Sequence, residues 1–160
     1  MSNNQKIITV GVGDLKIAKS PHLLKTLLGS CIGIVLHDHV NKVGGILHIM
    51  LPFPKGDDSK ITKYADPGLP YFIQQMLTRA GSHRSSIFAK IFGGAKMFQT
   101  KGDLFNIGDE NEAAVRRILQ KERIQIVAAK TGGVKGYNIV YDTESGEVSC
   151  RVFGDPVMVY

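Results

Sequence analysis

Short apolar runs with β-branched residues, separated by polar or glycine-containing turns, make up most of the chain. Runs of this length and pattern predict β-strands rather than helices. Because neighbouring runs are joined by short turns, most of them are expected to pair as antiparallel hairpins. The predicted strands lie at 6–12, 15–19, 31–37, 43–51, 87–92, 124–130, 137–142 and 147–153.

Two segments show helical periodicity instead. In the first, Asp66 is the expected N-cap, Pro67 suits the first helical position, and Gly81 is expected to end the helix. The second runs from about Gly108 to Arg123 and repeats its apolar residues at helical spacing. Many strands with two helices predict an α+β fold, a single layered α/β sandwich over residues 1–160 with mostly antiparallel strands.

The stretch from 25 to 52 (KTLLGSCIGIVLHDHVNKVGGILHIMLP) holds the residues with the clearest chemistry. A four-residue loop at 38–41 would place Cys31 opposite His48 in a hairpin. Directly opposed side chains share one face of a sheet, with Cβ atoms roughly 4.5–5.5 Å apart. A thiol beside an imidazole can pass its proton to that base and act as a nucleophile. Backbone N–H groups around Gly29, Ser30 and Cys31 could then bind an oxyanion.

The competing interpretation is purely structural, with Cys31 a small buried residue and His48 a hydrogen-bonded core histidine. The spacing of the two residues does not decide between these interpretations. The sequence GSCIG also matches a nucleophile elbow, but that motif needs a helix after the nucleophile, whereas a strand-like run follows here. Cys150 alternates with polar neighbours in a predicted strand and is expected to be a buried structural thiol.

Residues 52–66 (PFPKGDDSKITKYAD) have two prolines and no apolar periodicity, which predicts a surface loop directly after the strand that holds His48. Such a loop is a candidate for substrate contact, although an ordinary mobile loop is an equally good interpretation. His37, Asp38 and His39 are metal-ligand types without a second cluster, so no metal site and no cofactor are predicted.

Composition adds the expected setting. The chain has 160 residues, 43% of them hydrophobic and 21% charged, as in ordinary globular domains. Its N-terminus lacks the apolar segment of a secretory signal, and no apolar run approaches the roughly 18 residues of a membrane span. A cytoplasmic monomer is therefore expected. The net charge of +6 favours an acidic partner, but the absence of a long basic run argues against nucleic acid.

Several segments in order resemble the CheD family of chemoreceptor glutamine deamidases in bacterial and archaeal chemotaxis: TLLGSCIGIVLHD, KVGGILHIMLP, KYAD, IFGGAKMF, NIGDEN and TGG. The Cys-to-His spacing and the HIMLP ending are the most specific of these. The resemblance implies a layered fold similar to the catalytic domain of cytotoxic necrotizing factor toxins. It also implies hydrolysis of selected glutamine side chains on methyl-accepting chemoreceptors to glutamate and ammonia, without a cofactor.

The resemblance also implies roles for particular residues. Cys31 matches the family's catalytic cysteine, His48 its histidine, and Thr26 its threonine, which by analogy would orient the imidazole. In some bacteria such proteins also bind the phosphatase CheC. The alternative function is that of a non-catalytic adaptor, which would bind chemoreceptors or CheC and regulate them by occupancy.

Overall fold

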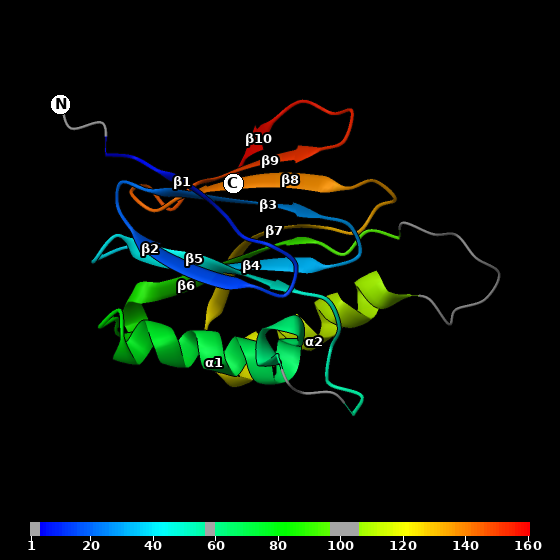
Figure 1. Ribbon diagram of the computed structural model, residues 1–160, viewed down its shortest axis with the longest axis horizontal. Coiled ribbons are helices and arrows are strands. Elements are labelled where there is room, and N and C mark those ends of the chain that lie inside the picture. Colours follow the sequence, from blue (N-terminus) through cyan, green and yellow to red (C-terminus); the bar gives the residue numbers. More distant parts are fainter. Residues whose placement is uncertain (1–3, 57–59, 97–105) are drawn as a thin grey trace.

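The chain folds into two β-sheets and a layer of helices, which a computed structural model describes for residues 4–56, 60–96 and 106–160 (Figure 1). The elements in chain order are β1 (Ile7–Thr9), β2 (Leu15–Lys19), β3 (Leu23–Leu28), β4 (Ile32–Asp38), β5 (Val43–Ile49), the 3-10 turn η1 (Ile61–Lys63), α1 (Ala65–Thr78), the 3-10 turn η2 (Arg84–Ser86), β6 (Ile87–Gly93), α2 (Ile107–Lys121), β7 (Gln125–Thr131), β8 (Tyr137–Asp142), β9 (Val148–Val152) and β10 (Met158–Val159).

The strands form a first sheet with the order β1-β3-β8-β9-β10 and a second with the order β2-β5-β4-β6-β7. Most neighbouring strands are antiparallel, as the hairpin pattern predicts, whereas β1 with β3 and β6 with β7 are parallel. Figure 1 shows the first sheet above the second, and both helices below the second sheet. The α+β layered fold predicted from the sequence is therefore confirmed.

The central hairpin β4–β5 is buried on both faces, because it lies between the helices and the first sheet. Ile34 and Leu47 belong to the apolar cluster between the second sheet and the helices, and Val35 and Ile46 to the cluster between the two sheets. Burial on both faces explains why these strands are nearly continuous apolar runs rather than alternating ones.

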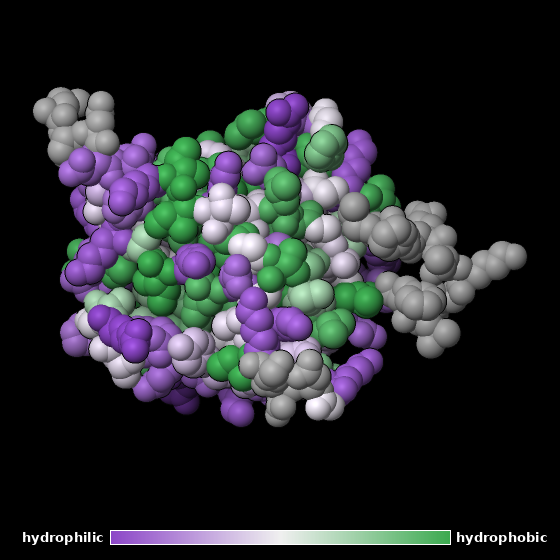
Figure 2. All heavy atoms as spheres, viewed as in Figure 1, coloured by the Kyte–Doolittle hydropathy of each residue, from purple (hydrophilic) through white to green (hydrophobic). Residues whose placement is uncertain are grey.

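The outer face of the first sheet, by contrast, is covered by neither of the helices α1 and α2 and meets solvent. Among its strands, Ile7, Leu27 and Val159 expose 60%, 68% and 58% of their surface. Figure 2 shows apolar surface mixed with hydrophilic side chains over the region of the two sheets. The two sheets therefore have different surroundings, and most of the buried polar side chains lie on or against the second sheet.

The register of the β4–β5 hairpin differs from the predicted one by two residues. His48 lies opposite Gly33, and Asp38 opposite Val43, so the loop is 39–42 rather than 38–41. Asp38 stays in the strand because its carboxylate accepts hydrogen bonds from the backbone N–H groups of Val40 and Asn41, at 2.9 and 3.1 Å. A shift by two preserves which side chains share a face, so the predicted facing holds although the direct pairing is wrong.

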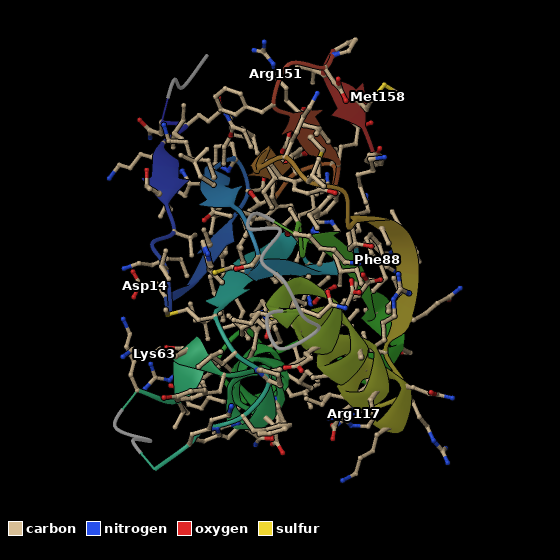
Figure 3. All side chains as sticks on the ribbon, turned by 90° about the vertical axis from the view of Figure 1, so that its right-hand side faces the viewer. Asp14, Lys63, Phe88, Arg117, Arg151 and Met158 are labelled. Carbon is tan, nitrogen blue, oxygen red and sulfur yellow. The ribbon has the colours of Figure 1, made fainter. Side chains whose placement is uncertain are left out.

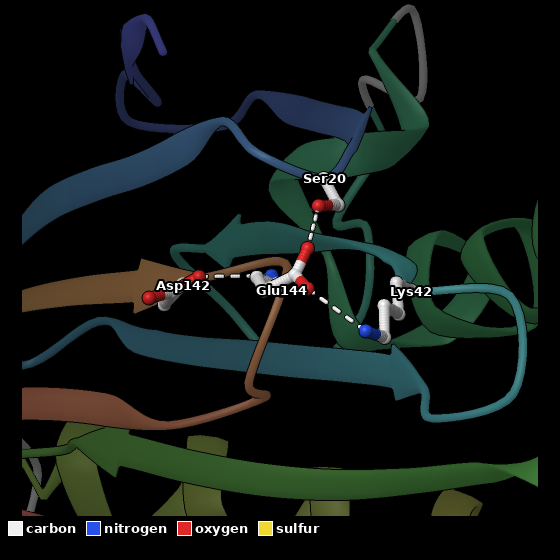
Figure 4. Close-up of polar contacts among 4 residues, drawn as sticks. All are labelled: Ser20, Lys42, Asp142 and Glu144. Atoms are coloured by element: carbon white, nitrogen blue, oxygen red, sulfur yellow. Dashed lines mark hydrogen bonds and ion pairs between the residues drawn. The ribbon is translucent and has the colours of Figure 1, made fainter. Parts of the chain in front are cut away.

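Polar contacts join the turns at this end of the two sheets, as Figure 4 shows. Glu144, in the turn between β8 and β9, forms an ion pair of 2.8 Å with Lys42 and a short hydrogen bond with Ser20. Its backbone N–H donates to Asp142 at 2.8 Å. These groups are exposed, so they help to align the turns and add little to stability.

The helices begin and end close to the predicted residues, with one difference at the first. Helix α1 starts at Ala65, and Asp66 has non-helical backbone angles inside it instead of capping it. Gly81 has the positive φ of 70° expected of a residue that ends a helix. No helix in the described part of the chain is long and apolar enough to cross a membrane.

The predicted loop 52–66 is only partly irregular. Residues 60–66 contain η1 and the start of α1, and the backbone N–H groups of Met50 and Leu51 both donate to the Lys63 carbonyl, at 2.7 and 3.2 Å. Residues 57–59 lie outside the described residues. The part that follows residue 59 is thus tied to the end of β5.

Candidate active site

The segment Gly29–Cys31 leads from β3 in the first sheet to β4 in the second, and all three of its carbonyl groups are anchored. The Gly29 carbonyl accepts from the Ala95 N–H at 2.9 Å, and the Cys31 carbonyl from the Gly94 N–H at 2.8 Å. The Ser30 carbonyl accepts from the Asn111 side chain at 3.1 Å. Among the described residues, no oxygen accepts a hydrogen bond from the N–H of Ser30 or Cys31, and the Cys31 N–H lies near the thiol sulfur of its own residue. Both N–H groups therefore remain available as donors.

The pair Gly93-Gly94 permits this close anchoring. Gly93 has a φ of 103°, and a Cβ added there would lie 2.3 Å from the Cys31 carbonyl oxygen. Gly94 has a φ of 71°, and a Cβ there would lie 3.1 Å from the Gly108 carbonyl oxygen at the start of α2. Only glycine fits both the backbone angles and the contacts. These glycines bring β6, the cysteine loop and α2 together.

His48 is held from the opposite sheet by Thr26. The Thr26 side chain is 3% exposed and points from β3 toward the second sheet, on the same face of β3 as Leu24 and Leu28. Its Oγ1 donates to the Val10 carbonyl at 2.7 Å and lies 2.7 Å from Nδ1 of His48. The structure thus brings two of the three residues named from the resemblance into direct contact.

These two contacts determine the tautomer of His48. A threonine hydroxyl has one hydrogen, and here it points to the Val10 carbonyl. The Thr26 oxygen must therefore accept the second bond, which requires a hydrogen on Nδ1 of His48. Nε2 then carries a free lone pair, and it is buried with no hydrogen-bond partner among the described residues. A buried, unpartnered imidazole nitrogen of this kind can accept a proton.

Burial sets the protonation states of both groups. It lowers the pKa of His48 to about 4, an effect that the negative charge of Asp14 partly opposes. Burial also raises the pKa of the Cys31 thiol above its usual value, whereas the backbone N–H of Cys31 itself lowers it. At neutral pH the resting pair is therefore a neutral thiol and a neutral imidazole.

Cys31 and His48 lie on the same face of the second sheet but are not paired directly. Gly33 is opposite His48, and Cys31 is two residues earlier, just before β4 begins. Diagonal neighbours in a sheet are about 7–8 Å apart, which long side chains can span. Cys31 is half-buried against the cluster between the sheets, and His48 is 1% exposed. The two side chains thus share a face, and no hydrogen bond between them is present among the described residues.

The backbone around His48 is fixed by two residues at one margin of the molecule. Figure 3 shows Asp14 and Lys63 at the same margin. The Asp14 carbonyl accepts from the His48 N–H at 3.0 Å, and the Lys63 carbonyl accepts from the Met50 N–H at 2.7 Å. The end of β5 that holds His48 is therefore fixed by backbone hydrogen bonds to two other segments.

The other candidate groups have structural contacts. His37 is 1% exposed, and its Nδ1 lies 2.6 Å from the Tyr141 hydroxyl. Asp38 holds the β4–β5 turn, as described above. Cys150 is 2% exposed in the cluster between the sheets, and burial raises its pKa to about 11. In residues 4–56, 60–96 and 106–160 no group of three or more His, Cys, Asp or Glu side chains could hold a metal ion.

A groove of about 590 Å³ begins at the cysteine loop. Gly29 lies at its edge, and the apolar side chains of Leu27, Tyr137 and Phe153 line it together with Lys135. Leu27 and Phe153 expose 68% and 76% of their surface, so the groove opens to solvent. The groove thus reaches Gly29, two residues before Cys31 in the chain.

Comparisons with known proteins agree on one family. A family model described as "CheD chemotactic sensory transduction" matches residues 50–152. A protein of Desulforamulus reducens named "Probable chemoreceptor glutamine deamidase CheD" is 44% identical over 157 residues, which are 95% of this chain and 94% of that protein. Proteins with the same name from Pyrococcus abyssi and Methanococcus vannielii are 41% and 38% identical, over 94% and 91% of this chain and 95% and 94% of their own.

The comparison with solved structures concerns the fold alone. The crystal structure of the Bacillus licheniformis hypothetical protein YfiH matches 78% of this chain and 59% of its own, with a TM-score of 0.50 and 16% identity. At that identity the likeness supports the layered architecture and carries no information about the reaction.

Proposed function

Because this chain belongs to the CheD family, we propose that it is a chemoreceptor glutamine deamidase in which Cys31 is the nucleophile and His48 the base. The observation that carries the proposal is the buried Nε2 of His48, which lacks a partner while Nδ1 is held by Thr26. Most buried side-chain polar atoms in folded proteins have a hydrogen-bond partner, so an unpartnered ring nitrogen indicates a role beyond packing.

The reaction begins with a proton transfer, because both groups are neutral at rest. Nε2 of His48 takes the thiol proton as the Cys31 sulfur bonds to the amide carbon of a glutamine side chain. The carbonyl electrons move onto oxygen and form an oxyanion, which the N–H groups of Ser30 and Cys31, beside Gly29, would stabilise. His48 then gives its proton to the nitrogen, the C–N bond breaks, and ammonia leaves a thioester on Cys31.

Water completes the reaction. His48 again accepts a proton, now from the water that attacks the thioester carbon, and returns it to the sulfur as the C–S bond breaks to release a glutamate side chain and the thiol. Thr26 supports each of these steps by keeping the hydrogen of the neutral imidazole on Nδ1. No step requires a cofactor.

The substrate and partners follow from the same proposal. We assign to this chain the cytoplasmic helices of methyl-accepting chemoreceptors as substrate, a cytoplasmic location, a monomeric state and the ability to bind a CheC phosphatase. The net charge of +6 supports an acidic partner. Receptor binding is therefore expected to weaken as the salt concentration rises.

A mass-spectrometric assay on receptor cytoplasmic fragments tests the proposal. The wild-type protein is expected to produce the mass increase of amide-to-carboxyl conversion at selected glutamines, and Cys31→Ala none. Cys150→Ala is the matched control, because it removes the other thiol from a buried structural position. Wild-type protein that binds the fragments without changing their mass would refute the enzyme and favour the adaptor function.

A further inference from the structure

Asn111 is a buried polar residue on an otherwise apolar stripe of α2. Its exposed fraction is 0%, and it shares the stripe with Ala114, Val115 and Ile118 at helical spacing. A buried amide costs free energy unless its polar atoms are hydrogen-bonded. The contacts of Asn111 therefore indicate what the residue does.

The amide nitrogen of Asn111 bridges the two strands that carry the proposed catalytic pair. Its Nδ2 donates to the Ser30 carbonyl at 3.1 Å and to the Met50 carbonyl at 2.9 Å. The β4–β5 ladder ends at the pair Ile32–Ile49, so Cys31 and Met50 would form the next pair. The Asn111 amide thus joins the strands where their own hydrogen bonds stop.

The bond to Ser30 fixes the direction of the Cys31 N–H. The Ser30 carbonyl and the Cys31 N–H belong to one planar trans peptide and point in opposite directions. A carbonyl turned toward Asn111 therefore turns the N–H away from α2. The same N–H lowers the pKa of the Cys31 thiol, which indicates that it lies close to the sulfur.

We propose that Asn111 is a positioning residue, which holds the Ser30–Cys31 peptide so that the Cys31 N–H can donate to the oxyanion. This inference rests on the proposed deamidation. When the sulfur of Cys31 bonds to the amide carbon, negative charge develops on the amide oxygen, and a donor already in place stabilises that charge. Asn111 itself does not touch the reacting atoms.

The oxygen of the Asn111 amide indicates that the side chain acts as a hydrogen-bond donor. Oδ1 of Asn111 is buried and has no hydrogen-bond partner among the described residues. Flipping the amide would place Oδ1 against two carbonyl oxygens, so the orientation with Nδ2 toward Ser30 and Met50 is the only favourable one. An aspartate of the same size would set an oxygen against both carbonyls.

The experiment compares Asn111→Leu and Asn111→Asp with Ser82→Ala. Ser82 also makes a buried hydrogen bond, to Asp38 at 2.6 Å, but this bond lies at the opposite end of β4 from Cys31. Three quantities are measured for each protein: kcat and KM on a receptor fragment, the melting temperature, and the pH profile of Cys31 alkylation by iodoacetamide, read on the Cys31 peptide by mass spectrometry.

Both Asn111 variants are expected to lower kcat by about 10- to 100-fold with KM unchanged. They should also move the midpoint of Cys31 alkylation to higher pH, because the N–H that favours the thiolate is no longer held near it. Ser82→Ala should lower the melting temperature and leave kcat and the alkylation profile at the wild-type values.

A folded Asn111 variant with wild-type kcat and a wild-type alkylation profile would overturn the proposal, even if its melting temperature fell. Either variant suffices if the other does not fold. If the wild-type protein itself shows no deamidation, the proposed function fails, and the alkylation profiles still decide whether Asn111 positions the Cys31 peptide.

Discussion

Removing the Thr26 hydroxyl tests how the base is oriented. Thr26→Val keeps the shape of the side chain but deletes both bonds of Oγ1, to the Val10 carbonyl and to Nδ1 of His48, each 2.7 Å long. Each partner left buried and unsatisfied costs about 1–3 kcal/mol, so the free energy of unfolding should fall by roughly 2–4 kcal/mol. The Nδ1–H form of His48 also loses its acceptor.

The catalytic effect follows from the second of these losses. An imidazole without the Thr26 acceptor can place its hydrogen on Nε2 or rotate, and neither arrangement accepts a proton from Cys31. A cost of about 1–3 kcal/mol to restore the productive form corresponds to a kcat roughly 10- to 100-fold lower.

Initial rates of glutamine conversion on a receptor fragment measure kcat, and urea unfolding measures stability. Thr26→Ser, which keeps the hydroxyl, is the matched control and should recover most of the rate. Thr26→Val with wild-type kcat, or Thr26→Ser as slow as Thr26→Val, would refute the reasoning.

Three further predictions concern the pH dependence of activity, the pH dependence of stability, and the substitution of a glycine beside Cys31. The pKa of about 4 for His48 predicts that kcat/KM falls only below roughly pH 5; an acid limb at the pKa of a free histidine would contradict this. Burial also lowers the pKa of His37 to about 4 from the ordinary 6.5, so the unfolded state binds more protons between these values. Stability should therefore be lost as pH falls from 6.5 to 4, by roughly 3 kcal/mol for each of the two histidines; urea unfolding independent of pH there would count against it. Gly93→Ala should displace Cys31 and reduce kcat, because the new Cβ would lie 2.3 Å from the Cys31 carbonyl oxygen. The control Gly81→Ala has a φ of 70° and open space around the new Cβ, so it should keep the wild-type kcat. Equal kcat values in the two variants would show that the contact with the Cys31 carbonyl does not matter.

The sequence predicted the layered fold and the face shared by Cys31 and His48, because both depend on short-range patterns. The hairpin was recognisable from its apolar runs, but its register was wrong by two residues. The carboxylate of Asp38 extends the strand by one residue and moves the loop to 39–42. Such a side-chain contact with a turn is not visible in an alternation of apolar and polar residues.

Thr26 and Asn111 could not be placed from the sequence, because their partners belong to other elements. The run LLKTLL divides its leucines equally between the two faces of a strand, so the sequence does not show that Thr26 lies on the buried face. Nor can that pattern show that the buried face meets His48 in the other sheet. Asn111 likewise lies on the apolar stripe of α2, and its contacts with Ser30 and Met50 depend on how the helix docks.

The bond between Thr26 and His48 has a consequence for how the protein loses activity. It joins a strand of the first sheet to a strand of the second, so it can form only while the two sheets are fully docked. A slight separation of the sheets on warming would release the imidazole while each sheet kept its own backbone ladder. Heat inactivation should thus precede the loss of secondary structure, so that the catalytic rate reports whether the two sheets are in contact.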